Sequence, residues 1–169
     1  MTQISPKRRE TIFSVISAGL FFIVIGAIFA YASFIEDVPL FDKIIDFVRP
    51  RNWELKEVFP NIRFVMLPRP ISSGATQRAI YGAVTRFNIV WSFCQAAILI
   101  LRMFARSPIS KKAETVSNIV SSLGTAYITY ILIENTPVNS AMWFGFWAQM
   151  IIILGISLLA RSIILAFRS

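Results

Sequence analysis

The sequence has no histidine and only one cysteine, Cys94. Without histidine the chain cannot hold haem through imidazole, build a zinc site of cysteine and histidine, or use imidazole as an acid or base. A single cysteine cannot build an internal disulfide framework. We therefore expect no metal site, no cofactor and no enzymatic activity.

Charged residues are also scarce. They make up 15% of the 169 residues, whereas 56% are hydrophobic, which is outside the range of ordinary soluble domains. Crossing the roughly 30 Å hydrocarbon core of a bilayer takes about 20 helical residues. Four apolar stretches are long enough: 11–35, 79–101, 113–133 and 141–163. The sequence thus predicts an all-α polytopic membrane protein, a single membrane domain of four antiparallel transmembrane helices.

The first stretch has one alternative interpretation. A basic start, an apolar run and "AYA" at 30–32 also describe a secretory signal peptide with its cleavage site. The apolar run is longer than the usual 7 to 15 residues of such a signal, which favours a span that is retained.

Acidic residues are few, so the formal net charge is +8. In a soluble protein this charge would suggest nucleic acid, but here its distribution suggests a membrane instead. The basic residues at one set of helix ends are Lys7, Arg8, Arg9, Arg102, Arg106, Lys111, Lys112, Arg161 and Arg168. Only Glu10 and Glu114 oppose them, whereas charges balance on the other side. By the positive-inside rule both termini and the turn after the second stretch are cytoplasmic, in the cell membrane.

The cytoplasmic charges have two interpretations. A basic turn attracts anionic lipid head groups, which we expect as partners in preference to a specific binding site or nucleic acid. Glu114 and Arg161 lie at similar depth because both are about 23 residues from a turn near Pro137. An inner charge clamp between them is therefore expected, with Arg102 as the competing partner of Glu114.

Residues 36–78 lie outside the membrane in this topology. In "VPLFDKIIDFVRP" apolar residues recur at steps of three and four, which predicts an amphipathic helix at the outer interface. Asn52 is a suitable N-cap for a second short helix ending near Pro60. The proline-rich segment from Ile62 predicts an extended arm.

Small and polar residues form stripes along three of the four stretches. Such stripes let helices approach closely in lipid, and they favour a tightly packed four-helix bundle over a cofactor groove. The expected packing positions are Gly19, Gly26, Ser117, Ser121, Gly124, Gly145 and Gly155.

The second stretch carries a continuous polar face. Steps of four and three along it connect Tyr81, Thr85, Asn88, Ser92, Gln95, Leu99 and Arg102, which keeps them on one side of a helix. Because polar groups in hydrocarbon need partners, we expect Asn88, Ser92 and Gln95 to be buried between helices with their amides bonded to a neighbouring span. The alternative is a polar path or ligand cleft to which Gln149 contributes.

Arg86 lies in the same stretch, about 10 Å from its outer end at 1.5 Å per residue. Its side chain points toward the outer surface, and its long stem can snorkel there. On a helical wheel it lies roughly 140° from the polar face. We therefore expect an outer anchor to head groups or to Glu54 or Glu57, with Glu134 as the alternative.

Two segments, "SPISKKAETVSNIVSSLGTAYI" at 107–128 and "WFGFWAQMIIILGISLLARSIIL" at 143–165, resemble stretches in small uncharacterised archaeal membrane proteins. The resemblance covers about a quarter of the chain. It implies an archaeal multispan protein and adds no site and no chemistry.

The function expected from these features is a non-enzymatic structural or accessory subunit that packs with itself or with other membrane proteins. The alternative is a small channel or transporter formed by oligomerisation around the polar face of the second stretch. No span carries an Asp or Glu away from its ends, so the carboxylate that proton-coupled pumps usually use is missing. An intramembrane enzyme is the third interpretation.

Overall fold

The computed structural model describes residues 6–57, 66–70, 74–134 and 140–167. Four of its helices are long and apolar enough to cross a membrane, which confirms the all-α prediction. In chain order the elements are α1 (Pro6–Phe34), α2 (Leu40–Val48), a 3-10 helix (Pro50–Asn52), β1 (Trp53–Glu57), β2 (Met66–Pro70), α3 (Gly74–Phe104), α4 (Ile109–Thr129), a π-helical turn (Tyr130–Glu134) and α5 (Ser140–Ala166).

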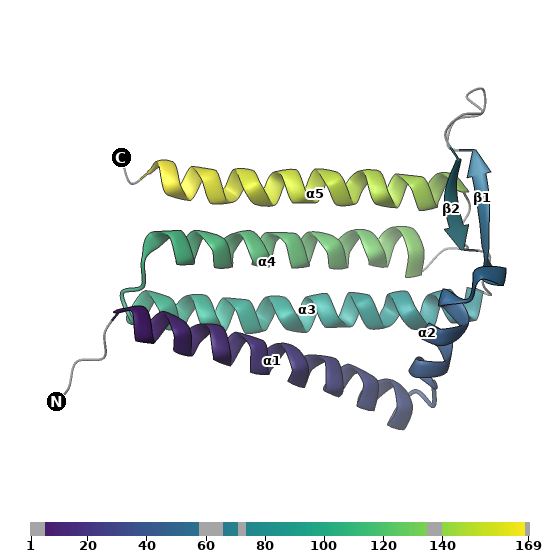
Figure 1. Ribbon diagram of the computed structural model, residues 1–169, viewed down its shortest axis with the longest axis horizontal. Helices are drawn as coiled ribbons and strands as arrows, with labels where there is room; N and C mark the ends of the chain where they lie inside the picture. Colours follow the sequence, from purple (N-terminus) through teal and green to yellow (C-terminus); the bar gives the residue numbers. More distant parts are fainter. Residues whose placement is uncertain (1–5, 58–65, 71–73, 135–139, 168–169) are drawn as a thin grey trace.

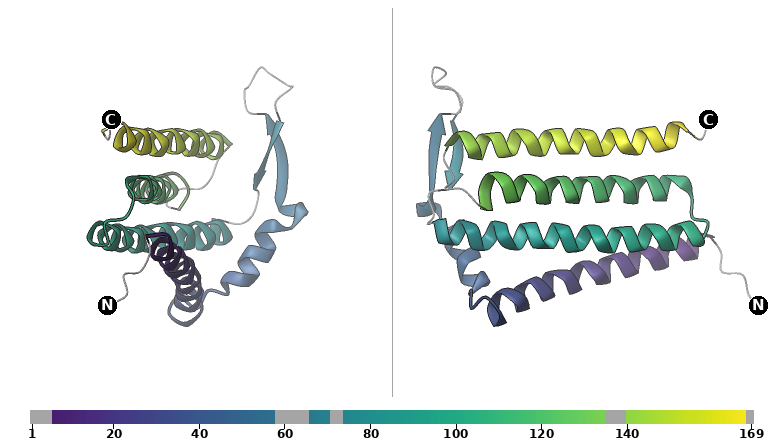
Figure 2. Two further views of the ribbon diagram at one scale, coloured as in Figure 1. Left: turned by 60° about the vertical axis from the view of Figure 1, so that its left-hand side comes forward. Right: turned by 180° about the vertical axis from the view of Figure 1, so that it is seen from behind.

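The four long helices lie in a row, in the order α1, α3, α4, α5 (Figures 1 and 2). α1 and α4 run toward the end that carries α2 and the β-strands, here called the hairpin end, and α3 and α5 run back. The opposite end, where α1 begins and α5 ends, is called the termini end. α3 packs most extensively on α4, α4 packs on α5, and α1 packs on α3 and α2.

The predicted four-helix bundle is therefore wrong in one respect, because the helices do not close around a common core. Large apolar side chains of α1 and α5 remain exposed, among them Phe22 at 71% and Ile151 at 70%. Apolar surface gains nothing by leaving lipid for protein, so no hydrophobic force closes the row into a ring.

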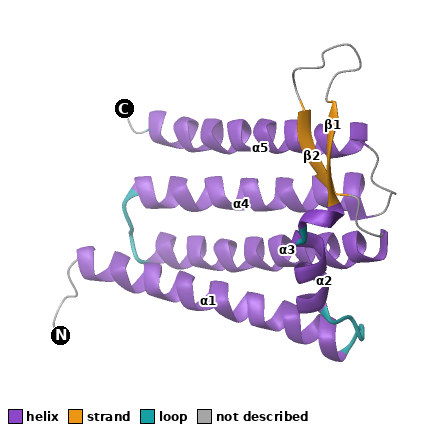
Figure 3. Ribbon diagram, turned by 45° about the vertical axis from the view of Figure 1, so that its right-hand side comes forward, coloured by secondary structure: helices purple, strands orange, loops and turns teal. Residues whose placement is uncertain are grey.

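α1 diverges from α3 toward the hairpin end, and α2 fills the wedge between them (Figure 3). Leu40 of α2 is buried with Ala32 of α1 and Ala83 of α3, and Ile44 packs against them. A second side of α2 is also apolar, and its side chains Phe41, Ile45 and Val48 are exposed. One side of α2 thus ties α1 to α3 and another faces outward.

The expected second outer helix is wrong. Asn52 ends a single 3-10 turn, and β1 follows, paired antiparallel with β2 so that Trp53 is opposite Pro70. The Trp53 indole donates a 2.7 Å hydrogen bond to the carbonyl of Phe47, and its ring lies 6.2 Å from that of Trp143. These contacts outweigh the local capping signal, whereas the predicted extended arm is confirmed at residues 66–70.

An aromatic cluster closes the hairpin end of the row. Tyr81 of α3 packs against Trp143 and Phe146 of α5, with ring centroids 6.3 Å apart in both pairs. Ile128 and Ile133, from α4 and the π-helical turn, complete the buried group. The cluster holds three long helices and the strands together at this end.

Candidate functional site

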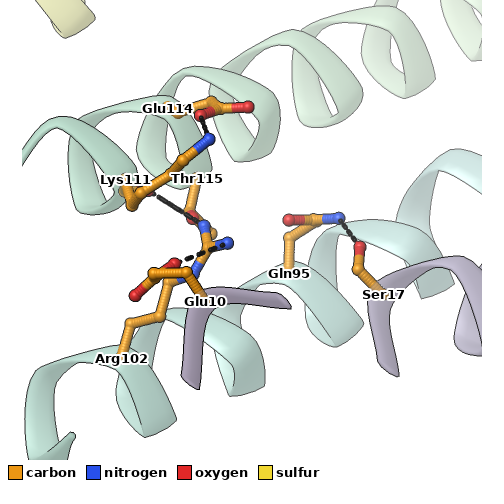
Figure 4. Close-up of polar contacts among 7 residues, drawn as sticks. All are labelled: Glu10, Ser17, Gln95, Arg102, Lys111, Glu114 and Thr115. Carbon is orange, nitrogen blue, oxygen red and sulfur yellow. Dashed lines mark hydrogen bonds and ion pairs between the residues drawn. The ribbon is translucent and has the colours of Figure 1, made fainter. Parts of the chain in front are cut away.

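The main polar feature of the helix row is a cavity of about 330 Å³ between α1, α3 and α4, toward the termini end. Its polar lining comes from all three helices (Figure 4). These residues are Ser14, Ser17, Gln95, Arg102, Lys111, Glu114 and Asn118. The cavity combines two cations and one carboxylate with hydroxyl and amide groups.

Arg102 lies at the termini end of this cavity and is only 7% exposed. One guanidinium nitrogen donates to the Lys111 carbonyl at 3.0 Å and to the Thr115 hydroxyl, and the other lies 3.5 Å from a Glu10 carboxylate oxygen. The Nε of Arg102 is buried and has no hydrogen-bond partner. Arg102 thus joins the beginnings of α1 and α4 to the end of α3.

The turn between α3 and α4 explains why Arg102 is held there. Arg106 takes a left-handed conformation with φ 51°, and the amides of Arg106 and Ser107 bond to the carbonyls of Met103 and Arg102. This is a Schellman motif, which ends α3 sharply and turns the chain into α4. The turn brings Arg102 within reach of Thr115.

The predicted clamp between Glu114 and Arg161 is not found. Glu114 pairs instead with Lys111 on its own helix, at 2.8 Å, and Arg102 pairs with Glu10. Lys111 lies one turn away from Glu114, so this pair needs no approach between helices, whereas Arg161 is exposed on α5. Of the other predicted basic residues at this end, Arg106 is exposed and Lys112 is half-buried.

The predicted burial is confirmed at Ser92 and Gln95, which are 3% and 4% exposed, whereas the predicted bond to a neighbouring span is confirmed only at Gln95. Gln95 is 4% exposed, and its amide donates across to the Ser17 hydroxyl of α1 at 3.4 Å. The Ser92 hydroxyl and the Asn88 amide donate to carbonyls of their own helix, at 2.7 and 2.9 Å. Local bonding of this kind satisfies a polar group without a second helix.

In the alternative interpretation, a polar path or ligand cleft, Gln149 would line the space beside Asn88 and Gln95, and this is wrong. It is exposed on α5, which packs on α4 and lies away from α1 in the row. Farther from the termini end than Gln95, the cavity is lined by the apolar side chains of Phe21, Phe22 and Trp91.

The small residues fall into two groups. A Cβ added at Gly124 of α4 would lie 2.8 Å from the Ile153 side chain of α5, so this glycine marks a close helix contact. On the same helix Ser117 is buried and Ser121 is half-buried. The glycines of α1 and α5 have nothing within 4 Å of an added Cβ. These are Gly19, Gly26, Gly145 and Gly155, and their predicted packing role is not fulfilled within the chain.

Arg86 is an anchor at the hairpin end, but its carboxylate partner is Glu36 and not Glu54 or Glu134. Its two terminal nitrogens each lie 2.6 Å from a carboxylate oxygen of Glu36, and its guanidinium lies 5.2 Å from the centre of the Tyr31 ring. Tyr31 lies in the last turn of α1, and Glu36 follows two residues after its end. Arg86 therefore ties α3 to the end of α1.

Glu134, the predicted alternative, nevertheless lies nearby. Its carboxylate is 3.4 Å, and the Arg86 guanidinium 3.9 Å, from a Cβ placed on Gly82. Sequence reasoning overlooked Glu36 because it was counted with the outer segment. The signal that could have found it is its spacing of five residues from Tyr31, just past the last turn of α1.

No family model, curated protein or solved structure matches this chain. Among the described residues, no group of three acidic or cysteine side chains could hold a metal ion.

Proposed function

We propose that the protein is a multi-pass membrane protein whose termini end is cytoplasmic and whose hairpin end is outside. The four apolar helices support the membrane placement. The excess of Lys and Arg at the termini end supports the orientation. Trp53 and Trp143 at the hairpin end suit the outer interface, where aromatic rings concentrate. The uncovered apolar face of α2 would lie in that same interface.

Within this membrane, we propose that the chain is a non-enzymatic structural or accessory subunit that packs with itself or with other membrane proteins. One observation carries this proposal: the glycines of α1 and α5 meet nothing in their own chain. Glycine costs a helix roughly 1 kcal/mol relative to alanine. In membranes, small residues at such positions typically let a second helix approach closely.

The test is assembly in mild detergent. Gly26→Leu on α1 and Gly155→Leu on α5 each add a bulky side chain where the chain itself has open space, so the subunit should fold. We expect at least one of them to remove a homo-oligomer or a stoichiometric partner seen with the wild type. Ala27→Leu, an exposed neighbour on α1, is the matched control. A wild type that purifies as a monomer without partners would contradict the proposal.

A small channel or transporter is the second candidate, and the 330 Å³ cavity that reaches Gln95 favours it. The polar lining of the cavity reaches no farther along α3 than Gln95, and Gln149 lies on the far side of the row, so the described residues of one chain do not continue this lining across the membrane. A pathway would thus need a second copy. Solute flux in vesicles that Gln95→Leu abolishes would support it.

A further inference from the structure

The cavity between α1, α3 and α4 changes character along its length. At the termini end it is lined by Arg102, Lys111 and Glu114, and farther along α3 by Trp91 with the Phe21 and Phe22 rings of α1. Phe22 is 71% exposed, so this deeper part is open to the hydrocarbon. A ligand that fits must be charged at one end and apolar at the other.

The charge at the polar end favours an anion. Arg102 and Lys111 line this end against one carboxylate, Glu114. The described charged residues elsewhere at the termini end of the row are Arg8, Arg9, Arg106, Lys112 and Arg161, with Glu10 as the acidic one. The buried guanidinium of Arg102 still has an unused donor, Nε. Donors of this kind bind phosphate oxygens strongly.

The length of the cavity matches one leaflet. Arg102 and Trp91 are eleven residues apart on α3, which is about 16 Å at 1.5 Å per residue. Half of a hydrocarbon core of roughly 30 Å is nearly the same. A phosphate beside Arg102 and Lys111 would therefore place the end of an acyl chain beside Trp91.

Polar side chains at the walls of the cavity are exposed. Ser14 of α1 and Asn118 of α4 are exposed on helices that cross the bilayer in the proposed topology. Polar groups that face hydrocarbon are unfavourable, because acyl chains offer them no hydrogen-bond partner. The polar glycerol and ester groups of a phospholipid can form hydrogen bonds with such side chains, whereas its acyl chains cannot.

We infer that this cavity binds one anionic phospholipid of the cytoplasmic leaflet, with its phosphate at Lys111 and Arg102 and an acyl chain along Phe21, Phe22 and Trp91. The inference rests on the membrane placement proposed above. It does not depend on whether the protein is an accessory subunit.

The test uses the full chain in phosphatidylcholine vesicles that contain a minor proportion of one brominated lipid. The lipid is either phosphatidylglycerol or phosphatidylcholine, brominated near the end of one acyl chain, where bromine quenches tryptophan fluorescence on contact. The fluorescence lost in Trp91→Phe identifies the signal of Trp91. We expect brominated phosphatidylglycerol to quench that signal more strongly than brominated phosphatidylcholine.

Lys111→Gln should lower this preference roughly fivefold, which corresponds to about 1 kcal/mol for one lysine near an anionic head group. Lys111→Arg should retain it. The matched control is Lys112→Gln, because Lys112 is adjacent in sequence and does not line the cavity. As a second measurement, native mass spectrometry of the wild type should show one retained phospholipid per chain, and Lys111→Gln should lose it.

Equal quenching of Trp91 by the two brominated lipids would overturn the inference, since it would mean ordinary annular lipid. If Lys111→Gln and Lys112→Gln lowered the preference for phosphatidylglycerol equally, the inference would also be overturned, because general surface charge would then attract the lipid. A second copy that covers the cavity and protects Trp91 from both lipids would do the same. Trp147, 49% exposed on α5, should be quenched by both lipids in every case and so tests membrane insertion separately.

Discussion

Replacing Gly124 with alanine should weaken the contact between α4 and α5. The new methyl carbon would lie 2.8, 2.9 and 3.0 Å from Cγ2, Cδ1 and Cγ1 of Ile153. Carbon atoms pack best at about 3.5–4.0 Å, so all three contacts are too short. A β-branched residue in a helix has essentially one χ1 rotamer. Ile153 therefore cannot rotate away, and the two helices must separate.

The size of the effect follows from two opposing quantities. Overpacking costs roughly 1–3 kcal/mol, whereas alanine gains about 1 kcal/mol over glycine in helix propensity. We expect the free energy of unfolding to fall by up to roughly 2 kcal/mol. In an Ile153→Ala background the overlap disappears, so a double-mutant cycle should give a coupling of about 1–3 kcal/mol.

The assay is denaturation by SDS, followed by tryptophan fluorescence. Gly155→Ala is the control, because an added Cβ there meets nothing within 4 Å and only the propensity gain should remain. If Gly124→Ala and Gly155→Ala behave alike, or if Ile153→Ala leaves the Gly124→Ala penalty unchanged, then α4 and α5 do not meet at this glycine.

Three further substitutions test the polar contacts with the same assay. Arg86→Lys loses one of the two 2.6 Å bonds to Glu36 and should lower the free energy of unfolding by roughly 0.2–1 kcal/mol, since both side chains are about one-third exposed. In a Glu36→Gln background this loss should vanish. Arg106→Gly removes a side chain from a residue with φ 51° and should stabilise by roughly 1 kcal/mol; an unchanged midpoint would argue against that turn. Glu10→Gln removes the carboxylate that compensates the buried charge of Arg102 and should lower the free energy of unfolding by roughly 1–3 kcal/mol. In an Arg102→Met background Glu10→Gln should cost less.

The helices were predictable because their physical requirement is one of length and composition. Any run of about 20 apolar residues satisfies it. When the π-helical turn is counted with α4, all four predicted stretches lie within observed helices, except for residue 35 at the end of the first stretch. The order of those helices in space could not be predicted in this way. It depends on which pairs pack closely, and apolar periodicity says little when both lipid and protein are apolar.

Polar positions were partly predictable for a similar reason. The pattern on α3 correctly identified Gln95 as an interhelical donor, but it could not tell that Asn88 and Ser92 bond within their own helix. Arg86 was expected to face lipid or the outer segment, but it pairs with Glu36 at the end of α1. Its partner Glu36 was missed because the pairing spans 50 residues and depends on how α1 meets α3.

α1 depends on polar contacts at both of its ends. At the termini end Arg9 donates to the carbonyl of Ala105 at 2.6 Å, which satisfies a free carbonyl at the C-terminal end of α3. The Glu10 pair with Arg102 reinforces the same junction. At the hairpin end the corresponding contact is the bidentate pair of Arg86 and Glu36.

Between these ends α1 meets α3 through one aromatic group, in which the Phe21 ring lies 5.5 Å from that of Phe87 and 5.4 Å from that of Trp91. Gln95 and Ser17 add a long hydrogen bond of 3.4 Å, while Gly19 and Gly26 have nothing within 4 Å of an added Cβ. Burying the remaining side of α1 would gain little in lipid, so the charged ends and the aromatic contact set its position and leave that side uncovered. The same arrangement leaves one side of α1 as a wall of the cavity and its glycine positions open to a second chain.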